Sequence, residues 1–265
     1  MVIVHTIRHV FPIIYAIISS MDQETILNVH DLSVTLDGNL ILNNLSFFIK
    51  KGDVLAIVGP NGAGKSVLFR TLLGLFPYQG SIVWGQALKI NYIPQKFYID
   101  KDLPLTIKEF MEFKDGDLEK IIHALMSVGV ADDSHDGHVE HFIREHLLNR
   151  RLSLLSGGQL QRVLIAWSIL DNPDVLLFDE PTSGIDIGGE ETIYNLIEKL
   201  RIERNMTVLL ISHDLNIVYK YANNVICLNK KMICFGRPNL VLDPAALSQL
   251  YGGEVSFYKH EHAHE

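Results

Sequence analysis

The sequence predicts an α/β protein whose core is a mainly parallel β-sheet with helices on both faces. Three observations predict this class. Short apolar strands alternate with helical segments along most of the chain, a glycine-rich loop at residues 59–64 stands between a strand and a helix, and an apolar strand at 175–178 is followed by two carboxylates. Alternating strands and helices indicate crossover connections, which leave the strands parallel. A chain of 265 residues is long enough to bury a substantial core under these elements.

Periodicity places the individual elements in order. Residues 26–35 alternate apolar and polar side chains, as a half-buried strand does, whereas residues 54–58 are apolar throughout, as a fully buried strand is. Further strands are expected at residues 45–49, 81–84, 90–93, 175–178 and 207–212, with two more around 229–231. Helices are expected at residues 65–73, 107–113, 118–128, 138–148, 159–170, 188–204 and 214–221. The helices between about 106 and 157 form an insert rather than a continuation of the sheet.

Composition narrows the class of protein further. Hydrophobic residues make up 48% and charged residues 20% of the chain, which is a globular balance. The net charge of −8 argues against a nucleic-acid partner held by phosphate neutralisation. The two cysteines, Cys227 and Cys234, are too few for a disulfide framework. We therefore expect two small core residues in a reducing compartment rather than a metal-linked pair.

The N-terminal segment is apolar but matches no targeting signal well. Residues 10–18 are too short for a membrane span of about 20 residues, and Pro12 interrupts them. Residues 19–21 do not form a small-x-small cleavage site. We therefore expect Met21 to be the true start and residues 1–20 to be an upstream extension. No other segment approaches a membrane span, so another chain would supply any membrane part.

The strongest motif is a phosphate-binding loop. It matches the pattern G-x-x-x-x-G-K-[ST] in full, with the residues Gly59, Pro60, Asn61, Gly62, Ala63, Gly64, Lys65 and Ser66. Glycines let successive backbone N–H groups point at phosphate oxygens, and the helix that follows adds its N-terminal dipole. Lys65 would reach the β- and γ-phosphates, and Ser66 would give its hydroxyl to Mg²⁺. The motif therefore predicts that ATP binds here together with Mg²⁺.

A pair of carboxylates follows the apolar strand at 175–178. Asp179 and Glu180 come at the carboxyl end of that strand, which is the edge where ligands bind in parallel sheets. Asp179 would hold the metal through its water shell, and Glu180 would polarise an attacking water. Together with the phosphate loop, this pair predicts hydrolysis of the nucleotide.

A second anion site is predicted ahead of the helix at 159–170. The turn contains two glycines, so bare backbone N–H groups and a helix N-terminus coincide at the residues Ser156, Gly157, Gly158 and Gln159. One polypeptide rarely needs two such sites for one nucleotide. A head-to-tail pair of identical chains does, because each chain then closes over the other's ATP.

These three motifs together resemble the ATP-binding subunits of ABC transporters, over residues 26–258. The turn at residues 155–159 resembles the signature motif of that family. The resemblance implies a P-loop NTPase fold of ABC type, in which an antiparallel β subdomain and a helical insert at about 106–157 accompany the parallel core. It places one ATPase domain at residues 21–258 and leaves a His-rich tail at 259–265.

The same resemblance implies roles for single residues. Gln95 resembles the glutamine that senses Mg²⁺ and couples to the membrane partner, and His213 resembles the switch histidine at the γ-phosphate. Asp186 resembles the aspartate of the D-loop, although Gly184-Ile185 stands where the family more often has Ala-Leu. The family usually stacks adenine on an aromatic residue, and the aligned position here is Leu36. A leucine offers apolar contact without π-stacking, so weak selectivity for adenine over guanine is predicted.

Weaker features bear on the transported cargo. Residues 92–107 and 225–236 resemble zinc-import ATPases, whose tails are often His-rich as well. The tail alternates the residues His260, His262 and His264, and neutral imidazole suits Zn²⁺. The alternative for the tail is a solvated segment without a metal. Solvent exposure is also the expectation for the insert histidines His135, His138, His141 and His146.

The resemblance thus implies an ATP-hydrolysing subunit of an importer for divalent metal, with zinc the first choice. The implied partners are a second copy of the chain, an integral-membrane permease and a periplasmic or extracellular zinc-binding protein, without nucleic acid. The chain would lie peripherally on the cytoplasmic face of the inner membrane. Alternatives are a manganese or iron import ATPase, or a soluble ABC ATPase in cluster assembly.

Overall fold

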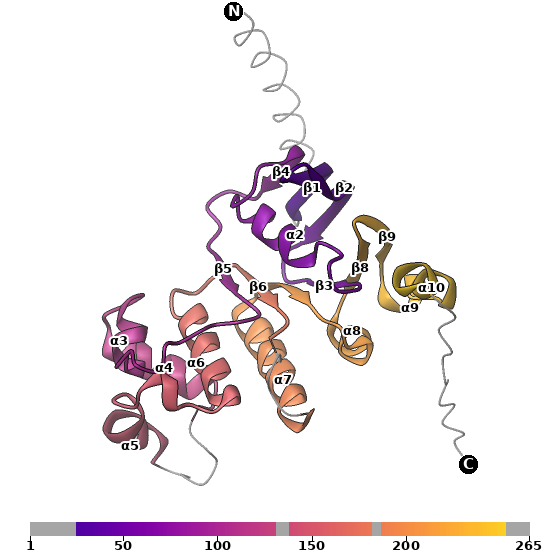
Figure 1. Ribbon diagram of the computed structural model, residues 1–265. Helices are drawn as coiled ribbons and strands as arrows, with labels where there is room; N and C mark the ends of the chain where they lie inside the picture. The colour runs from indigo at the N-terminus through magenta and orange to yellow at the C-terminus, as the bar shows by residue number, and fades with distance from the viewer. Residues whose placement is uncertain (1–24, 131–137, 182–186, 253–265) are drawn as a thin grey trace, which may run out of the picture.

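A computed structural model describes residues 25–130, 138–181 and 187–252. Its strands form two sheets, and the helices between residues 107 and 169 gather in a lobe beside the larger sheet (Figure 1). The strands are β1 (Thr25–Leu36), β2 (Asn39–Lys50), β3 (Val54–Val58), β4 (Gln79–Trp84), β5 (Ile90–Ile93), β6 (Val175–Asp179), β7 (Thr207–Ile211), β8 (Asn224–Asn229) and β9 (Lys231–Gly236). The helices are α2 (Lys65–Leu72), α3 (Ile107–Glu112), α4 (Leu118–Ser127), α5 (Val139–Phe142), α6 (Gly157–Ile169), α7 (Ile187–Arg204), α8 (Leu215–Tyr221), α9 (Pro238–Val241) and α10 (Pro244–Tyr251).

The larger sheet has the strand order β5-β6-β7-β3-β8-β9, and every neighbouring pair in it is parallel except β8–β9. The smaller sheet has the order β2-β1-β4 and is antiparallel. Every residue of β3, β6 and β7 is buried, which explains why these strands are apolar without alternation. The predicted fold class, with its antiparallel subdomain and helical insert, is confirmed.

The larger sheet separates two hydrophobic cores, and β6 contributes to both. Leu176 and Phe178 pack into the core shared with the helical lobe and α7. Val175 and Leu177 face the opposite core, which also contains α2 and the smaller sheet. Successive side chains of a strand point to opposite faces, so one short strand joins the lobe to the subdomain. The residues that follow β6 are therefore anchored on both sides.

The helices predicted for the helical lobe are present in the structure, except that the one expected at 138–148 is not a continuous α-helix. There α5 ends at Phe142, and a π-helical turn continues from Ile143 to Leu147. The Leu148 backbone N–H donates to the Ile143 carbonyl at 3.0 Å, five residues back. The wider turn brings Leu148 over Ile143, so that both side chains are buried. None of the helices in the described part of the chain is long and apolar enough to cross a membrane.

Cys227 and Cys234 form a disulfide, so the expectation of two unpaired core residues was wrong. The two residues lie opposite each other in the antiparallel pair β8–β9, with their Cα atoms 4.8 Å apart. The hairpin predicted around 229–231 was correct, and it is this hairpin that brings the two sulfurs together. Counting cysteines could not reveal the pairing, because it depends on the register of the two strands.

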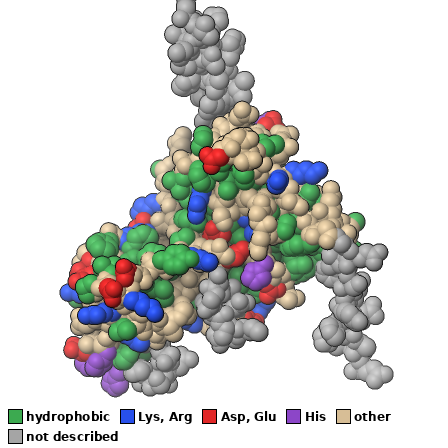
Figure 2. All heavy atoms as spheres, viewed as in Figure 1, with side chains coloured by type: hydrophobic (Ala, Val, Ile, Leu, Met, Phe, Trp, Pro, Cys, Tyr) green, Lys and Arg blue, Asp and Glu red, His purple; other side chains and the backbone are tan. Residues whose placement is uncertain are grey.

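Two histidine predictions can be placed on the structure. The side chains of His138, His141 and His146 are exposed at the end of the helical lobe, where Figure 2 shows histidines gathered over α5. Among the residues that the structure describes, no three His, Cys, Asp or Glu side chains gather into a metal-binding group. The tail histidines His260, His262 and His264 lie outside the described residues, as do residues 1–24 and His135, so the expectations for them remain predictions.

Candidate functional site

The predicted phosphate loop connects β3 to α2 and is shaped by three glycines with positive φ. Gly59, Gly62 and Gly64 have φ of 154°, 78° and 98°. A Cβ on Gly59 would stand 2.0 Å from the carbonyl oxygen of Leu228 in β8. The backbone N–H of Lys230 donates to the Ala63 carbonyl at 3.0 Å, so the β8–β9 turn is hydrogen-bonded to the loop. The loop is therefore held by the sheet before any ligand arrives.

The side chain of Lys65 lies against the backbone of this loop. Its ammonium donates to the carbonyl oxygens of Gly59 at 2.8 Å and Pro60 at 3.2 Å, and the residue is only 7% exposed. Burial lowers the pKa of Lys65, and the carboxylates of Glu180 and Asp179 act against that shift. A buried ammonium whose hydrogen bonds go to carbonyl groups is suited to exchange them for phosphate oxygens. Ser66 follows in the first turn of α2 and is half-buried.

Asp179 ends β6 and is 3% exposed. Its Oδ2 accepts a hydrogen bond from the Tyr92 hydroxyl at 3.1 Å, while its Oδ1 is buried without a hydrogen-bond partner in the described structure. An unpaired buried carboxylate oxygen is costly unless a cation or bound water satisfies it. Together with the half-buried Ser66 hydroxyl, Asp179 therefore fits the predicted Mg²⁺.

Glu180 stands one residue beyond β6 with a positive φ of 49°. The Gln95 side-chain amide donates to Glu180 Oε2 at 2.5 Å, and Glu180 Oε1 lies 3.9 Å from Lys65 Nζ. This meeting follows from the sheet, because Ile93 of β5 is paired with Phe178 of β6 in a parallel ladder. Gln95 and Glu180 each come two residues later and leave the sheet at the same edge.

His213 follows β7, the strand between β6 and β3, and its side chain is exposed. The turn before it is tied to the sheet, since the Ser212 backbone N–H donates to the Ile57 carbonyl at 3.3 Å. The Ser212 hydroxyl accepts from the backbone N–H of Asp214 at 3.1 Å. His213 is therefore at the same edge of the sheet as Asp179 and Glu180. Asp186 lies outside the described residues.

The second predicted anion site, at residues 156–159, forms the N-terminus of α6 in the helical lobe. Ser156 and Gln159 cap the helix reciprocally: the Ser156 hydroxyl accepts from the Gln159 N–H, and the Gln159 side chain accepts from the Ser156 N–H, each at 3.2 Å. Ser156 and Gly157 are exposed. In Figure 1, α6 lies in the lobe while α2 lies against the smaller sheet. Within one chain the two predicted anion sites therefore stay apart.

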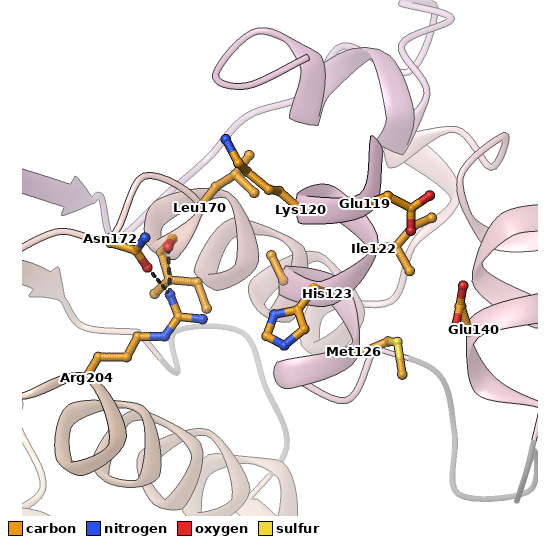
Figure 3. Close-up of a pocket in the computed structure, with 11 residues that line it drawn as sticks. Glu119, Lys120, Ile122, His123, Met126, Glu140, Leu170, Asn172 and Arg204 are labelled. Atoms are coloured by element: carbon orange, nitrogen blue, oxygen red, sulfur yellow. Dashed lines mark hydrogen bonds between the residues drawn. The ribbon is translucent and has the colours of Figure 1, made fainter. Parts of the chain in front are cut away.

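A cavity elsewhere in the molecule is separate from this site. It measures about 700 Å³ and lies between α4 and the ends of α6 and α7 (Figure 3). On one wall the Arg204 Nη1 donates to the carbonyl of Ile169 at 2.9 Å and to Asn172 Oδ1 at 3.0 Å. That cation ties the end of α7 to the turn after α6, so its contacts are structural.

Tyr92 is the site residue that sequence reasoning missed. Burial beside the Asp179 carboxylate raises the pKa of its hydroxyl to about 12, with the Arg70 guanidinium acting in the opposite direction. A tyrosine three positions before Gln95 carries no chemical signal by itself. Its contact with Asp179 could be found only by knowing that β5 is the neighbour of β6, since the two residues are 87 apart in sequence.

The Leu36 position leads to a prediction on base selectivity. Leu36 ends β1, is half-buried and packs against the core beside α2. We expect the affinities of this chain for ATP and GTP to agree within about threefold, because a leucine provides no π-stacking. Leu36→Tyr should tighten ATP binding by up to about tenfold, given about 0.5–1.5 kcal/mol for an aromatic stack.

Competition against a fluorescent nucleotide measures both quantities. Ile202→Tyr is the control, because Ile202 is 63% exposed near the end of α7 and lies on a different element from Leu36. A strong preference of the unsubstituted chain for ATP over GTP would contradict this prediction.

Known proteins that are similar to this chain point to one family. The family model described as ABC transporter matches residues 42–183. Two similar curated proteins are zinc import ATP-binding proteins ZnuC. The one from Yersinia enterocolitica is 39% identical over 248 residues, covering 91% of this chain and 93% of the relative. The one from Wigglesworthia glossinidia brevipalpis is 36% identical over 249 residues, covering 91% and 100%.

Solved structures have the same fold. An inward-facing ABC transporter of the metal-chelate type superposes with a TM-score of 0.72 at 28% identity, covering 85% of this chain and 88% of that one. An ATP-binding cassette of an ABC transporter in its ADP conformation gives a TM-score of 0.68 at 24% identity, covering 84% and 97%, and shows the fold alone. With the family model spanning more than half of its length, this chain belongs to the ABC transporter family.

Proposed function

We propose that this chain is the ATP-hydrolysing subunit of an importer for divalent metal, and that the metal is zinc. The observation that carries the ATPase assignment is the gathering of Lys65, Gln95, Asp179 and Glu180 at the carboxyl edge of one parallel sheet. The choice of zinc is supported by the zinc import ATP-binding proteins that are 36–39% identical over about nine-tenths of this chain.

ATP would enter with its phosphates against the glycine-rich loop. Lys65 would leave the carbonyl oxygens of Gly59 and Pro60 for the β- and γ-phosphates, keeping the same number of charge-assisted contacts. Ser66 and Asp179 would hold Mg²⁺, which supplies charge neutralisation at the transferring phosphate. Glu180 would orient the water that attacks the γ-phosphate, and His213 would contact that phosphate from the neighbouring strand end.

The Gln95–Glu180 hydrogen bond links the residue proposed to sense Mg²⁺ to the residue proposed to activate water. While the Gln95 amide is bonded to Glu180 Oε2, it occupies one of the hydrogen-bond acceptor positions of that carboxylate. We propose that ATP and Mg²⁺ draw Gln95 toward the metal and release Glu180. In this proposal Gln95 both responds to Mg²⁺ and controls whether Glu180 can orient the attacking water.

A second copy of the chain is part of this proposal. The exposed N-terminus of α6 presents backbone N–H groups and a helix dipole, yet it lies in the helical lobe away from the phosphate loop of its own chain. In a head-to-tail pair, residues Ser156 to Gln159 of one copy would close on the γ-phosphate held by the other.

A permease would dock on the helical lobe, on the cytoplasmic side of the membrane. Large apolar side chains are exposed between Gln95 and the residue after α3, including Tyr98 at 83% and Phe113 at 74%. Phe97 contacts Phe110 with ring centroids 5.6 Å apart, so this surface is connected to the core of the lobe. Figure 2 shows hydrophobic side chains at the surface of the helical lobe. Exposed apolar patches of this kind mark interaction sites.

The test is ATP hydrolysis by the complete complex in vesicles, with its permease and exported binding protein. Zn²⁺ on the binding-protein side is expected to raise hydrolysis severalfold, and the double variant Tyr98→Ser/Phe113→Ser is expected to lose that rise together with permease binding. Leu240→Ser is the control, because Leu240 is 76% exposed on α9 and lies outside the proposed docking surface. Stimulation by Mn²⁺ or Fe²⁺ but not by Zn²⁺ would refute zinc as the cargo.

A further inference from the structure

Tyr92 connects the strand that precedes Gln95 to the metal-binding carboxylate. In the β5–β6 ladder Tyr92 is the partner of Leu177, and Asp179 is two residues further along β6 on the same face. The Tyr92 ring packs edge-to-face against Phe69 of α2, with ring centroids 6.4 Å apart. The ring is thus fixed between β6 and the helix that follows the phosphate loop.

The hydroxyl of Tyr92 fixes the orientation of the Asp179 carboxylate. Oδ2 accepts the Tyr92 O–H at 3.1 Å, and Oδ1 is buried without a partner in the part of the chain that the structure describes. The terminal torsion of an aspartate is broad, so the backbone alone does not fix the plane of the carboxylate. A hydrogen bond to one oxygen fixes that plane and thereby the direction in which the other oxygen points.

We propose that Tyr92 is a positioning residue for metal binding: its O–H holds Asp179 Oδ2, so that Oδ1 is presented to the Mg²⁺ that accompanies ATP. Hydrogen bonds from outside the ligand shell commonly orient metal-binding groups in this way, and their loss typically costs about 10–100-fold in metal affinity or activity. The inference rests on the proposed binding of ATP with Mg²⁺ and assigns a further residue to that site.

A purely structural role is the competing explanation, because loss of a buried hydrogen bond lowers stability wherever it occurs. The two roles differ in their dependence on Mg²⁺. A structural role predicts that Tyr92→Phe changes unfolding and leaves the Mg²⁺ titration in place. A positioning role predicts that the same variant needs more Mg²⁺ to reach the same nucleotide affinity, while metal-free binding stays nearly unchanged.

The experiment titrates Mg²⁺ into the full chain with the ATP analogue that has a non-hydrolysable imido bridge, and reads binding by calorimetry. For Tyr92→Phe we expect a rise of about tenfold or more in the Mg²⁺ concentration that gives half of the maximal increase in nucleotide affinity. In EDTA, the nucleotide affinity of the variant should stay within about twofold of that of the unsubstituted chain. Tyr219→Phe is the matched control, because its hydroxyl also donates over 3.1 Å, to the carbonyl of Leu242 in another part of the fold.

If Tyr92→Phe is less stable than the unsubstituted chain, a second measurement separates the positioning role from the loss of stability. In an Asp179→Asn background, Tyr92→Phe should add little to the Mg²⁺ requirement, since the group it positions has gone. Identical Mg²⁺ titrations for Tyr92→Phe and the unsubstituted chain would overturn the role of Tyr92 alone. An unsubstituted chain whose nucleotide binding ignores Mg²⁺ would overturn the proposed metal site and the role of Tyr92 with it.

Discussion

Glu180→Gln is expected to bind ATP as the unsubstituted chain does and to hydrolyse it at least about 100-fold more slowly. A positioned acid–base group contributes about 10²–10⁴-fold, and glutamine keeps the size of the side chain while removing the carboxylate that polarises water. The neighbouring groups remain, because Lys65 is held by Gly59 and Pro60 and Asp179 by Tyr92. Steady-state phosphate release measures the loss, and a fluorescent nucleotide measures the retained binding.

The same variant tests the proposed pairing of two chains. Because ATP would remain uncleaved between two copies, light scattering is expected to detect an ATP-dependent dimer that persists in Glu180→Gln and turns over in the unsubstituted chain. Glu203→Gln is the control, since Glu203 lies in the last turn of α7 and is 53% exposed. Full hydrolysis by Glu180→Gln would refute the assignment of Glu180.

Gly59→Ala is expected to destabilise the chain by about 3 kcal/mol and to abolish measurable ATP binding. The added Cβ would stand 2.0 Å from the Leu228 carbonyl oxygen, which is backbone and cannot move without opening the β3–β8 pair. Overpacking typically costs about 1–3 kcal/mol, and the φ of 154° adds strain of about 1–3 kcal/mol for a residue with a side chain. Urea unfolding measures the loss of stability.

The matched control for this change is Gly116→Ala. Gly116 lies in an exposed loop of the helical lobe, where a Cβ meets nothing within 4 Å and no positive φ is required. Its unfolding free energy should stay within about 0.5 kcal/mol of the unsubstituted value. If Gly59→Ala unfolds at the same urea concentration as Gly116→Ala and still binds ATP, the loop is not held against β8 in the way described.

Much of the site could be predicted because its motifs consist of neighbouring residues. The strand β3 and the start of α2 were predicted to the residue, since a run of apolar side chains followed by glycines and a lysine reflects local backbone requirements. The helix expected at 159–170 begins two residues earlier, at Gly157, because Ser156 caps it. The π-turn after α5 was not predictable, because it depends on how Leu148 is buried against the rest of the lobe.

Sequence alone determined the chemistry of each segment: a loop for phosphates, a strand ending in carboxylates, and a helix N-terminus for a second anion contact. Tertiary structure decided which of these segments meet. The placement of β5 beside β6 brings Gln95 to Glu180 and Tyr92 to Asp179, and the β8–β9 register joins Cys227 to Cys234. The physical reason is that periodicity and turn preference depend on near neighbours in the chain, whereas strand order follows from burying both faces of one sheet.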